Sequence, residues 1–284
     1  MLQAVKWQVR HALIRYRRLR PTRLISDWAR ARRLQCGANP RAHRPVPRSE
    51  PVVISLSTIP ERAALIGPVI ASLRDQTVPA DRIVLAWPRV SLRTGQPYPD
   101  PPALPDDVSC LRCVDVGPAS KLLPVLMAEP EAAIIVVDDD VIYPADFVAT
   151  LLAAHREAPA AAIGYRGWRI QAGRSSGRFD HVFATALDRR AAVDVLLGTW
   201  GYLVPPGALD AAVHDFSGYP EAVRWVDDVW ISGHLARRGV PRLVVPARGL
   251  PIETRASGVA ALTFGLNRSG ANDRAAIAAF AQWW

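Results

Sequence analysis

The sequence predicts an α/β protein with a mostly parallel, Rossmann-like sheet flanked by helices. From residue 52 onward, short apolar runs rich in β-branched residues alternate with stretches in which apolar residues have helical spacing. Strands that alternate with helices of roughly 10–15 residues are typical of βαβ units. Of the 284 residues, 50% are hydrophobic, which is enough to bury a sizeable core.

The expected elements follow one another in a regular order. The run VVISLSTI (52–59) ends at Pro60, and residues 61–76 then show helical spacing. The further expected strands are 82–88, 108–116, 132–137, 161–167, 201–206 and 241–246, and the further helices are 119–128, 145–157 and 227–238. Residues 88–105 contain six prolines and should form an exposed, irregular loop.

The positive charge is concentrated near the N-terminus. Residues 1–50 contain 13 Lys/Arg and 2 Asp/Glu, a net charge of +11, whereas the remainder carries −2. We therefore divide the chain into a basic segment with a Pro/Arg-rich linker (1–50) and a single domain (51–284). A nucleic-acid-binding domain would carry its charge on the folded body, so no nucleic-acid partner is expected.

The first residues predict a basic amphipathic helix. Its apolar stripe consists of Leu2, Val5, Val9, Leu13 and Tyr16. Such a helix either docks on its own domain or lies on an anionic membrane surface, where Trp7 and Trp28 could sit at the lipid interface. No apolar run of about 18 residues and no signal peptide is evident. The expected location is therefore cytoplasmic, with peripheral attachment at the inner membrane left open.

Three acids directly follow the most apolar strand, in IIVVDDDVIYP. In open α/β sheets, ligands bind at the carboxyl ends of the strands. An extended backbone alternates faces, so Asp138 and Asp140 should project together while Asp139 points away. Two carboxylates on one side favour Mn²⁺ or Mg²⁺ held jointly with substrate phosphates. The alternative is a polar turn without function.

A rare lysine marks a second candidate site. The chain has 33 arginines and only two lysines, Lys6 and Lys121. At Lys121, in GPASKLLP, a compact ammonium near a helix start favours contact with a diphosphate. A solvated lysine is the alternative.

An acidic pair opens the helix expected at 227–238, in WVDDVWISGHLARRG. Asp227 and Asp228 could cap free N–H groups. Alternatively, one of them is a general base for an acceptor hydroxyl, with Trp225 and Trp230 as platforms for a sugar ring.

Together these segments resemble the GT-A fold glycosyltransferases, in particular family 2 and related bacterial sugar transferases. The resemblance covers about residues 51–250 and lies in STIPER (57–62), SLRDQTVPADRIVLAWP (72–88), GPASKL (117–122), VVDDDV (136–141) and WVDDVW (225–230). It implies the transfer of one sugar from a nucleotide-sugar donor, most simply a UDP-sugar, to a glycan or lipid-linked acceptor. It further implies a role in bacterial surface polysaccharide synthesis and inversion of configuration.

The resemblance also implies roles for single residues. On the donor side it places Ser57, Thr58, Pro60, Arg62, Lys121 and Asp139. Asp138 and Asp140 match the D-x-D motif that holds the metal, and Asp228 matches the catalytic base, with Asp227 beside it. Trp200 and Gly201, in GTWGYLVPP, would lie next to the acceptor, together with Trp225 and Trp230.

Some features of the family are missing. No histidine matches a third metal ligand, and the Q-x-x-R-W signature of polymerising synthases is absent. These departures favour a single transfer. Two other functions stay open: a nucleotidyltransferase of related fold, and a non-catalytic nucleic-acid-binding protein that uses the basic N-terminus. The former usually has a Gly-rich loop after its first strand, where this chain reads STIPER.

Overall fold

The computed structural model describes residues 19–38, 40, 47–170, 179–259 and 270–284. The amphipathic helix expected near the N-terminus lies outside these residues.

A mixed eight-stranded sheet forms the centre of the molecule, in the order β3-β2-β1-β4-β11-β6-β12-β9. Its strands are β1 (Val52–Ser57), β2 (Arg82–Pro88), β3 (Val108–Cys113), β4 (Ala133–Val136), β6 (Ala162–Gly164), β9 (Ala191–Ala192), β11 (Tyr202–Val204) and β12 (Arg242–Val244). The first four in chain order are mutually parallel, whereas β11 runs antiparallel between β4 and β6. The predicted α/β class is confirmed, with a reversed strand at its centre.

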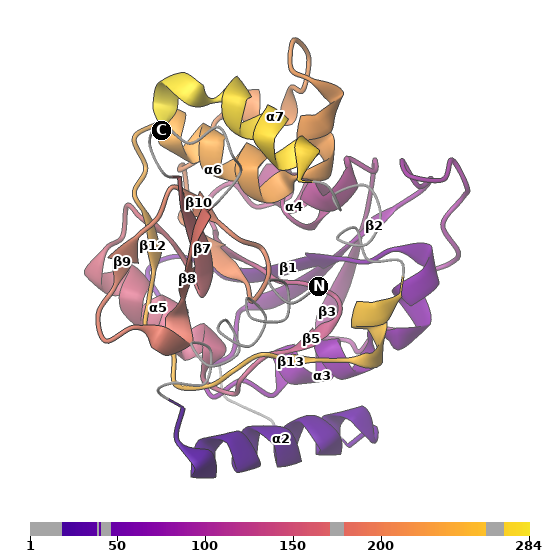
Figure 1. Cartoon of the computed structure of the whole chain (residues 1–284). Helices are drawn as coiled ribbons and strands as arrows, with labels where there is room; N and C mark the ends of the chain where they lie inside the picture. The colour runs from indigo at the N-terminus through magenta and orange to yellow at the C-terminus, as the bar shows by residue number, and fades with distance from the viewer. Residues whose placement is uncertain (1–18, 39, 41–46, 171–178, 260–269) are drawn as a thin grey trace, which may run out of the picture.

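Helices cover both faces of this sheet. They are α2 (Pro21–Gln35), α3 (Gly67–Arg74), α4 (Leu123–Ala128), α5 (Phe147–Glu157), α6 (Asp227–Arg237) and α7 (Ala271–Ala279). Figure 1 shows α2 and α3 on one side of the sheet and α4, α6 and α7 on the other.

The helix expected at 61–76 is broken in two. A 3₁₀ turn (Pro60–Leu65) comes first, and α3 begins at Gly67 with Pro68 in its first turn. Proline lacks the N–H that would continue the preceding helix, but its fixed φ suits a helix start. The segment expected at 119–128 divides in the same way, with Pro124 in the first turn of α4.

Two small sheets lie beside the central one and were not predicted. One has the order β10-β7-β8, with β7 (Arg166–Ile170), β8 (Phe179–Phe183) and β10 (Val195–Leu196). The other pairs β5 (Val141–Ile142) with β13 (Ile252–Glu253). The single strand expected at 161–167 is thus two strands, because the chain leaves the central sheet at Tyr165.

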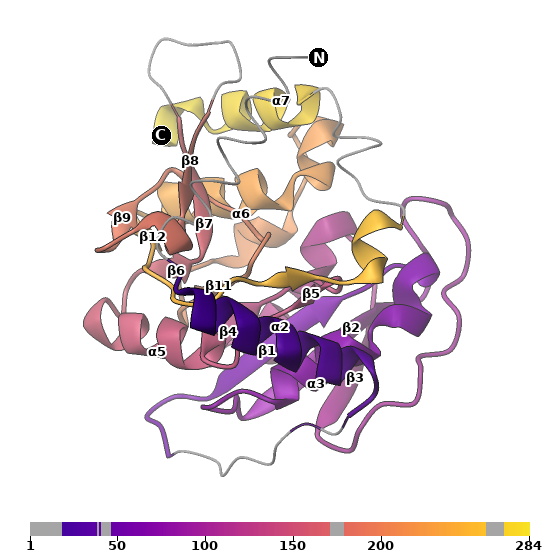
Figure 2. The same cartoon turned by 60° about the horizontal axis from the view of Figure 1, so that its bottom comes forward.

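The helix α2 packs on the domain. Its Ala31 and Leu34 are buried with Ile142, and Figure 2 shows the helix lying across the domain, with α3 and β5 nearby. Arg30 forms an ion pair with the buried Asp75 at 2.7 Å, and Arg23 pairs with Asp146 at 2.6 Å. Residues 21–35 are therefore docked on their own chain. No helix among the described residues has both the length and the apolar character needed to cross a membrane.

Candidate functional site

A cleft of about 680 Å³ opens along the carboxyl ends of the parallel strands. Ser57 is the last residue of β1 and Thr58 follows it, the three acids follow β4, and Asp115 follows β3. The cleft thus lies where open α/β sheets bind their ligands.

Most of the residues singled out from the sequence line this cleft. They are Ser57, Thr58, Arg62, Lys121, Asp138, Asp139, Asp140, Trp200, Trp225, Asp227 and Asp228. Pro60, Gly201 and Trp230 are not among the lining residues. The fold therefore brings together residues as far apart in the sequence as Ser57 and Asp228.

The three acids do not alternate as expected. The strand β4 ends at Val136, and residues 139–140 form a turn, so the strand rule for side-chain direction no longer applies. Asp139 and Asp140 both accept from Nη1 of Arg62, at 2.8 and 3.0 Å. Asp139 also accepts from the Thr58 hydroxyl at 2.5 Å. Asp138 turns instead toward Lys121, whose Nζ lies 3.0 Å away.

Lys121 connects the two acidic motifs. Its Nζ is 3.0 Å from Asp138 and 3.2 Å from Asp227. Burial disfavours its charge, but the attraction of Asp138 and Asp227 outweighs burial, so the pKa of Lys121 lies well above its usual value. Only 12% of the side chain is exposed, which excludes a solvated lysine.

Asp227 and Asp228 occupy the first turn of α6, where the helix dipole favours negative charge. Neither side chain caps the helix, because the N-cap residue is Val226 and no side-chain cap hydrogen bond forms. Asp228 instead accepts from the Gly198 backbone N–H at 2.6 Å. Burial, followed by the charge of Asp227, raises the pKa of Asp228 to about 8.

Gly198 makes this arrangement possible. A Cβ at this position would lie 2.4 Å from Nζ of Lys121 and 3.0 Å from Oδ1 of Asp228. Any larger residue would displace the lysine or the acid.

The four residues expected beside the acceptor have different positions. Trp200 and Trp225 line the cleft, and Trp200 has φ of 78°, a strained backbone for a bulky residue. Gly201 is needed for packing, because its φ is 79° and a Cβ would lie 2.6 Å from the Phe147 ring. Trp230 is fully buried. Its indole N–H donates to the Val213 carbonyl at 2.9 Å, so it belongs to the core and cannot stack on a sugar.

The electrostatics of the cleft suit a divalent cation. Among the residues that the structure describes, eight carboxylates line it, against four Arg or Lys side chains. Burial, and then the charges of Asp138 and Asp139, raise the pKa of Asp140 to about 7. The nearby positive charges of Arg62 and Lys121 therefore do not balance the negative charge around Asp140. Within the described ranges, there is no group of three or more His, Cys, Asp or Glu side chains that could hold a metal ion by itself. Mg²⁺ and Mn²⁺ need only one or two carboxylates when substrate phosphates complete the coordination.

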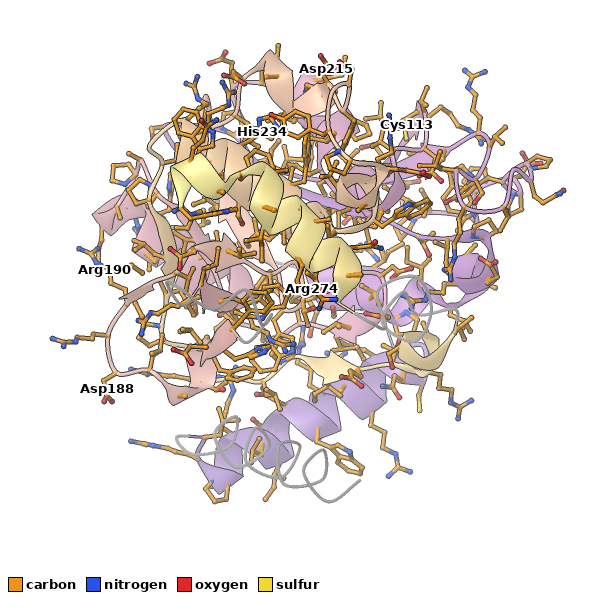
Figure 3. The ribbon with its side chains drawn as sticks, turned by 45° about the horizontal axis from the view of Figure 1, so that its top comes forward. Cys113, Asp188, Arg190, Asp215, His234 and Arg274 are labelled. Carbon is orange, nitrogen blue, oxygen red and sulfur yellow. The ribbon has the colours of Figure 1, made fainter. Side chains whose placement is uncertain are left out.

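The segment 252–259 was missed by the sequence analysis. Its strand β13 pairs with β5, directly after the acids, and Thr254 N–H donates to the Asp140 carbonyl at 2.8 Å. Arg62 donates to the Val259 carbonyl at 2.8 Å. Glu253 and Ser257 line the cleft, as does Asp273 of α7. Figure 3 shows its neighbour Arg274 near one end of α7, with His234 near the opposite end. No motif marks this segment, and only its contacts identify it.

The chain was compared with known proteins. No model of a protein family matches it, and no curated protein matches its sequence significantly. Among solved structures, it is similar to the mannosyltransferase PcManGT from Pyrobaculum calidifontis in complex with GDP-Man and Mn²⁺. The identity is 14% and the TM-score 0.52, over 91% of this chain and 71% of that one.

A second solved structure is GalNAc-T7 with UDP, GalNAc and Mn²⁺. The identity is 12% and the TM-score 0.49, and the match covers 69% of this chain but only 42% of that one. The likeness to the mannosyltransferase, together with the strand order, shows that this chain has the GT-A fold.

Proposed function

We propose that this protein is a metal-dependent glycosyltransferase that moves one sugar from a nucleotide-sugar donor to a hydroxyl acceptor. The observation that carries the proposal is the double ion pair of Lys121, which holds Asp138 of one acidic motif and Asp227 of the other at a single cleft. The GT-A fold supports it, and so does the solved mannosyltransferase of this fold, which binds GDP-Man and Mn²⁺.

The donor would lie over the β1–β4 side of the cleft. Asp138 and Asp140 would hold Mn²⁺ or Mg²⁺, since their oxygens suit hard cations. When bound, the cation would neutralise charge on the leaving diphosphate. Arg62 and Thr58 fix Asp139 and thereby orient the whole acid loop. Ser57 lines the same side and could bond to the nucleotide.

Asp228 is the proposed general base. It lies in the cleft at the start of α6, and its raised pKa makes it a stronger proton acceptor than an ordinary carboxylate. The Gly198 N–H holds Oδ1 of Asp228, and Oδ2 would accept the proton of an acceptor hydroxyl. A base on the acceptor side favours direct displacement, and hence inversion.

The acceptor side and the cellular setting are proposals of the same kind. A glycan or lipid-linked acceptor and a role in bacterial surface polysaccharide synthesis follow from the family resemblance. Residues 1–18, with their excess of arginine, could hold the enzyme peripherally at an anionic membrane surface.

Calorimetry with UDP and GDP tests the proposal. We expect one of them to bind in the presence of Mn²⁺ and to lose at least roughly tenfold in affinity in EDTA, because the diphosphate then meets an excess of carboxylates. Asp140→Asn should lose the Mn²⁺ dependence. Asp107→Asn, an exposed acid outside the cleft, is the matched control. Nucleotide binding that ignores Mn²⁺ would contradict the metal role.

A further inference from the structure

One wall of the cleft is formed by the antiparallel strands β7 and β8, to which the proposed function assigns no role. In its antiparallel register, Arg166, Trp168 and Ile170 lie opposite Phe183, His181 and Phe179, respectively. Directly opposed side chains share a face of the sheet, so this face is largely aromatic. Arg166, Trp168 and His181 from it line the cleft.

Trp168 is held rigidly on this wall. Its ring stacks on Phe179 with a centroid distance of 4.6 Å and an interplanar angle of 10°. Its indole N–H donates to Nδ1 of His181 at 3.1 Å. The only polar group of the indole and one face of the ring are therefore already engaged. Trp168 therefore presents an immobilised aromatic surface to the cleft. A ligand that packs on this ring loses little free energy to the ordering of the side chain, because the side chain is already ordered.

The backbone connects Trp168 to the proposed base. Trp168 pairs with Val195 of β10, and Leu197 N–H donates to the Arg166 carbonyl at 2.9 Å. The next residue is Gly198, whose N–H holds Asp228. Val195 and Gly198 are three residues apart, which limits their separation to about 10 Å. The ring therefore lies on the Asp228 side of the cleft, whereas the donor motifs follow β1 and β4.

We infer that Trp168 is the stacking platform for a pyranose ring of the acceptor, and that the acceptor is a neutral saccharide. One face of a pyranose carries C–H groups that pack on an aromatic ring, while its hydroxyls donate to acids. Because carboxylates outnumber Arg and Lys by eight to four among the described residues of the lining, an acidic sugar is repelled. The assignment as acceptor rests on the proposed function, but the binding of the ring can be measured without transfer.

The test is direct binding to the full-length protein by saturation-transfer NMR. The probes are the methyl glycosides of glucose, galactose, mannose and glucuronic acid, each with and without UDP and Mn²⁺. We expect at least one neutral glycoside to bind, and the glucuronide to bind more weakly than its glucose counterpart. Trp168→Ala should weaken the neutral glycoside by roughly tenfold or more. Trp168→Phe should retain most of the affinity.

The matched control is Trp28→Ala on α2, because Trp28 is 58% exposed and lies outside the cleft. It should leave glycoside binding unchanged. UDP or GDP binding to Trp168→Ala should equal wild type, which also shows that the variant is folded. Equal glycoside affinity in wild type and Trp168→Ala would overturn the inference, as would a wild type that binds no neutral glycoside up to the solubility limit. Failure of nucleotide binding would contradict the proposed function alone.

Discussion

Lys121 and Asp227 form an ion pair of 3.2 Å between the 3₁₀ turn that precedes α4 (Gly117–Lys121) and the start of α6. The same ammonium holds Asp138. Asp227 is thereby committed to a buried cation, whereas its neighbour Asp228 accepts, within the described part of the chain, from a backbone N–H. The two acids of one motif therefore have different tasks, and this difference can be measured.

Asp228→Asn should leave nucleotide binding unchanged and lower kcat by roughly 10²- to 10⁴-fold, because an amide cannot accept the acceptor proton. The amide oxygen can still accept from Gly198, so the fold should persist. Asp227→Asn should instead weaken nucleotide binding and lower Tm, because it leaves Lys121 with one partner fewer. Steady-state kinetics, calorimetry and thermal melts distinguish the two. An inactive Asp227→Asn with an active Asp228→Asn would reverse the assignment.

The rate of transfer should increase with pH and level off above about 8. The base is the carboxylate form of Asp228, whose pKa is raised to about 8 by burial and by Asp227. The ionised fraction therefore grows as the pH rises through this value. Profiles of kcat from below to well above pH 8 test this. The residual activity of Asp228→Asn should lack this rise of kcat with pH. An identical pH profile in that variant would assign the titration to another group.

Gly198→Ala should abolish transfer with little change in overall secondary structure. The new Cβ would lie 2.4 Å from the Lys121 ammonium and 3.0 Å from Asp228, so at least one of them must move. Gly67→Ala is the matched control, because its Cβ would meet nothing within 4 Å and its φ is not positive. Circular dichroism and transfer assays on both variants are the measurements. Wild-type kinetics in Gly198→Ala would show that the close contact is not required.

Trp230→Ala and Trp225→Ala should separate stability from binding. Trp230 is fully buried and stacks on Phe216 at 4.5 Å, so its truncation should cost about 3–5 kcal/mol of unfolding free energy. Trp225 lines the cleft, so its truncation should raise the KM for the acceptor while the free energy of unfolding changes little. Urea titrations and acceptor kinetics provide the two readouts. Equal losses of stability would place both rings in the core.

Stability should decrease as the pH falls from 6.5 toward 4, in part because of His234. Burial and the nearby Arg237 lower the pKa of His234 to about 4 in the folded state. The unfolded chain takes up this proton near pH 6.5, so between these values protons favour unfolding. His234 packs among Trp230, Tyr219 and Phe280. His234→Leu should flatten the dependence of Tm on pH. His214→Gln is the comparison, because burial also lowers the pKa of His214, but this histidine is less buried than His234 and its variant should have the smaller effect.

The sequence predicted those elements whose local pattern agrees with their surroundings. The apolar runs that became β1, β2 and β4 are buried on both faces in the structure, so β-branched composition alone identified them. The acids after β4 and the pair at the start of α6 were also found, because acids directly beside apolar runs are conspicuous. Helix boundaries were wrong at Pro68 and Pro124, where proline chemistry overrides apolar spacing.

Other features depend on contacts between distant residues. The direction of the acid side chains could not be predicted, because it depends on where β4 ends and on Arg62 and Lys121, which come from other elements. The role of Trp230 was assigned to the cleft because its neighbours are acids, although a helix turns successive side chains to different sides. The aromatic face of β7 and β8 has no local signature, since the pairing across the hairpin creates it.

The backbone bond from Thr254 to Asp140 and the pairing of β13 with β5 have a consequence for the order of assembly during synthesis. The ribosome releases the N-terminal strands first, and domains fold as units while the chain emerges. The acid loop cannot acquire its final support until residues 252–259 have left the ribosome, because contacts of such long sequence separation form late. A nascent chain that already contains Asp138, Asp140 and Asp228 is therefore still unfinished as a binding site.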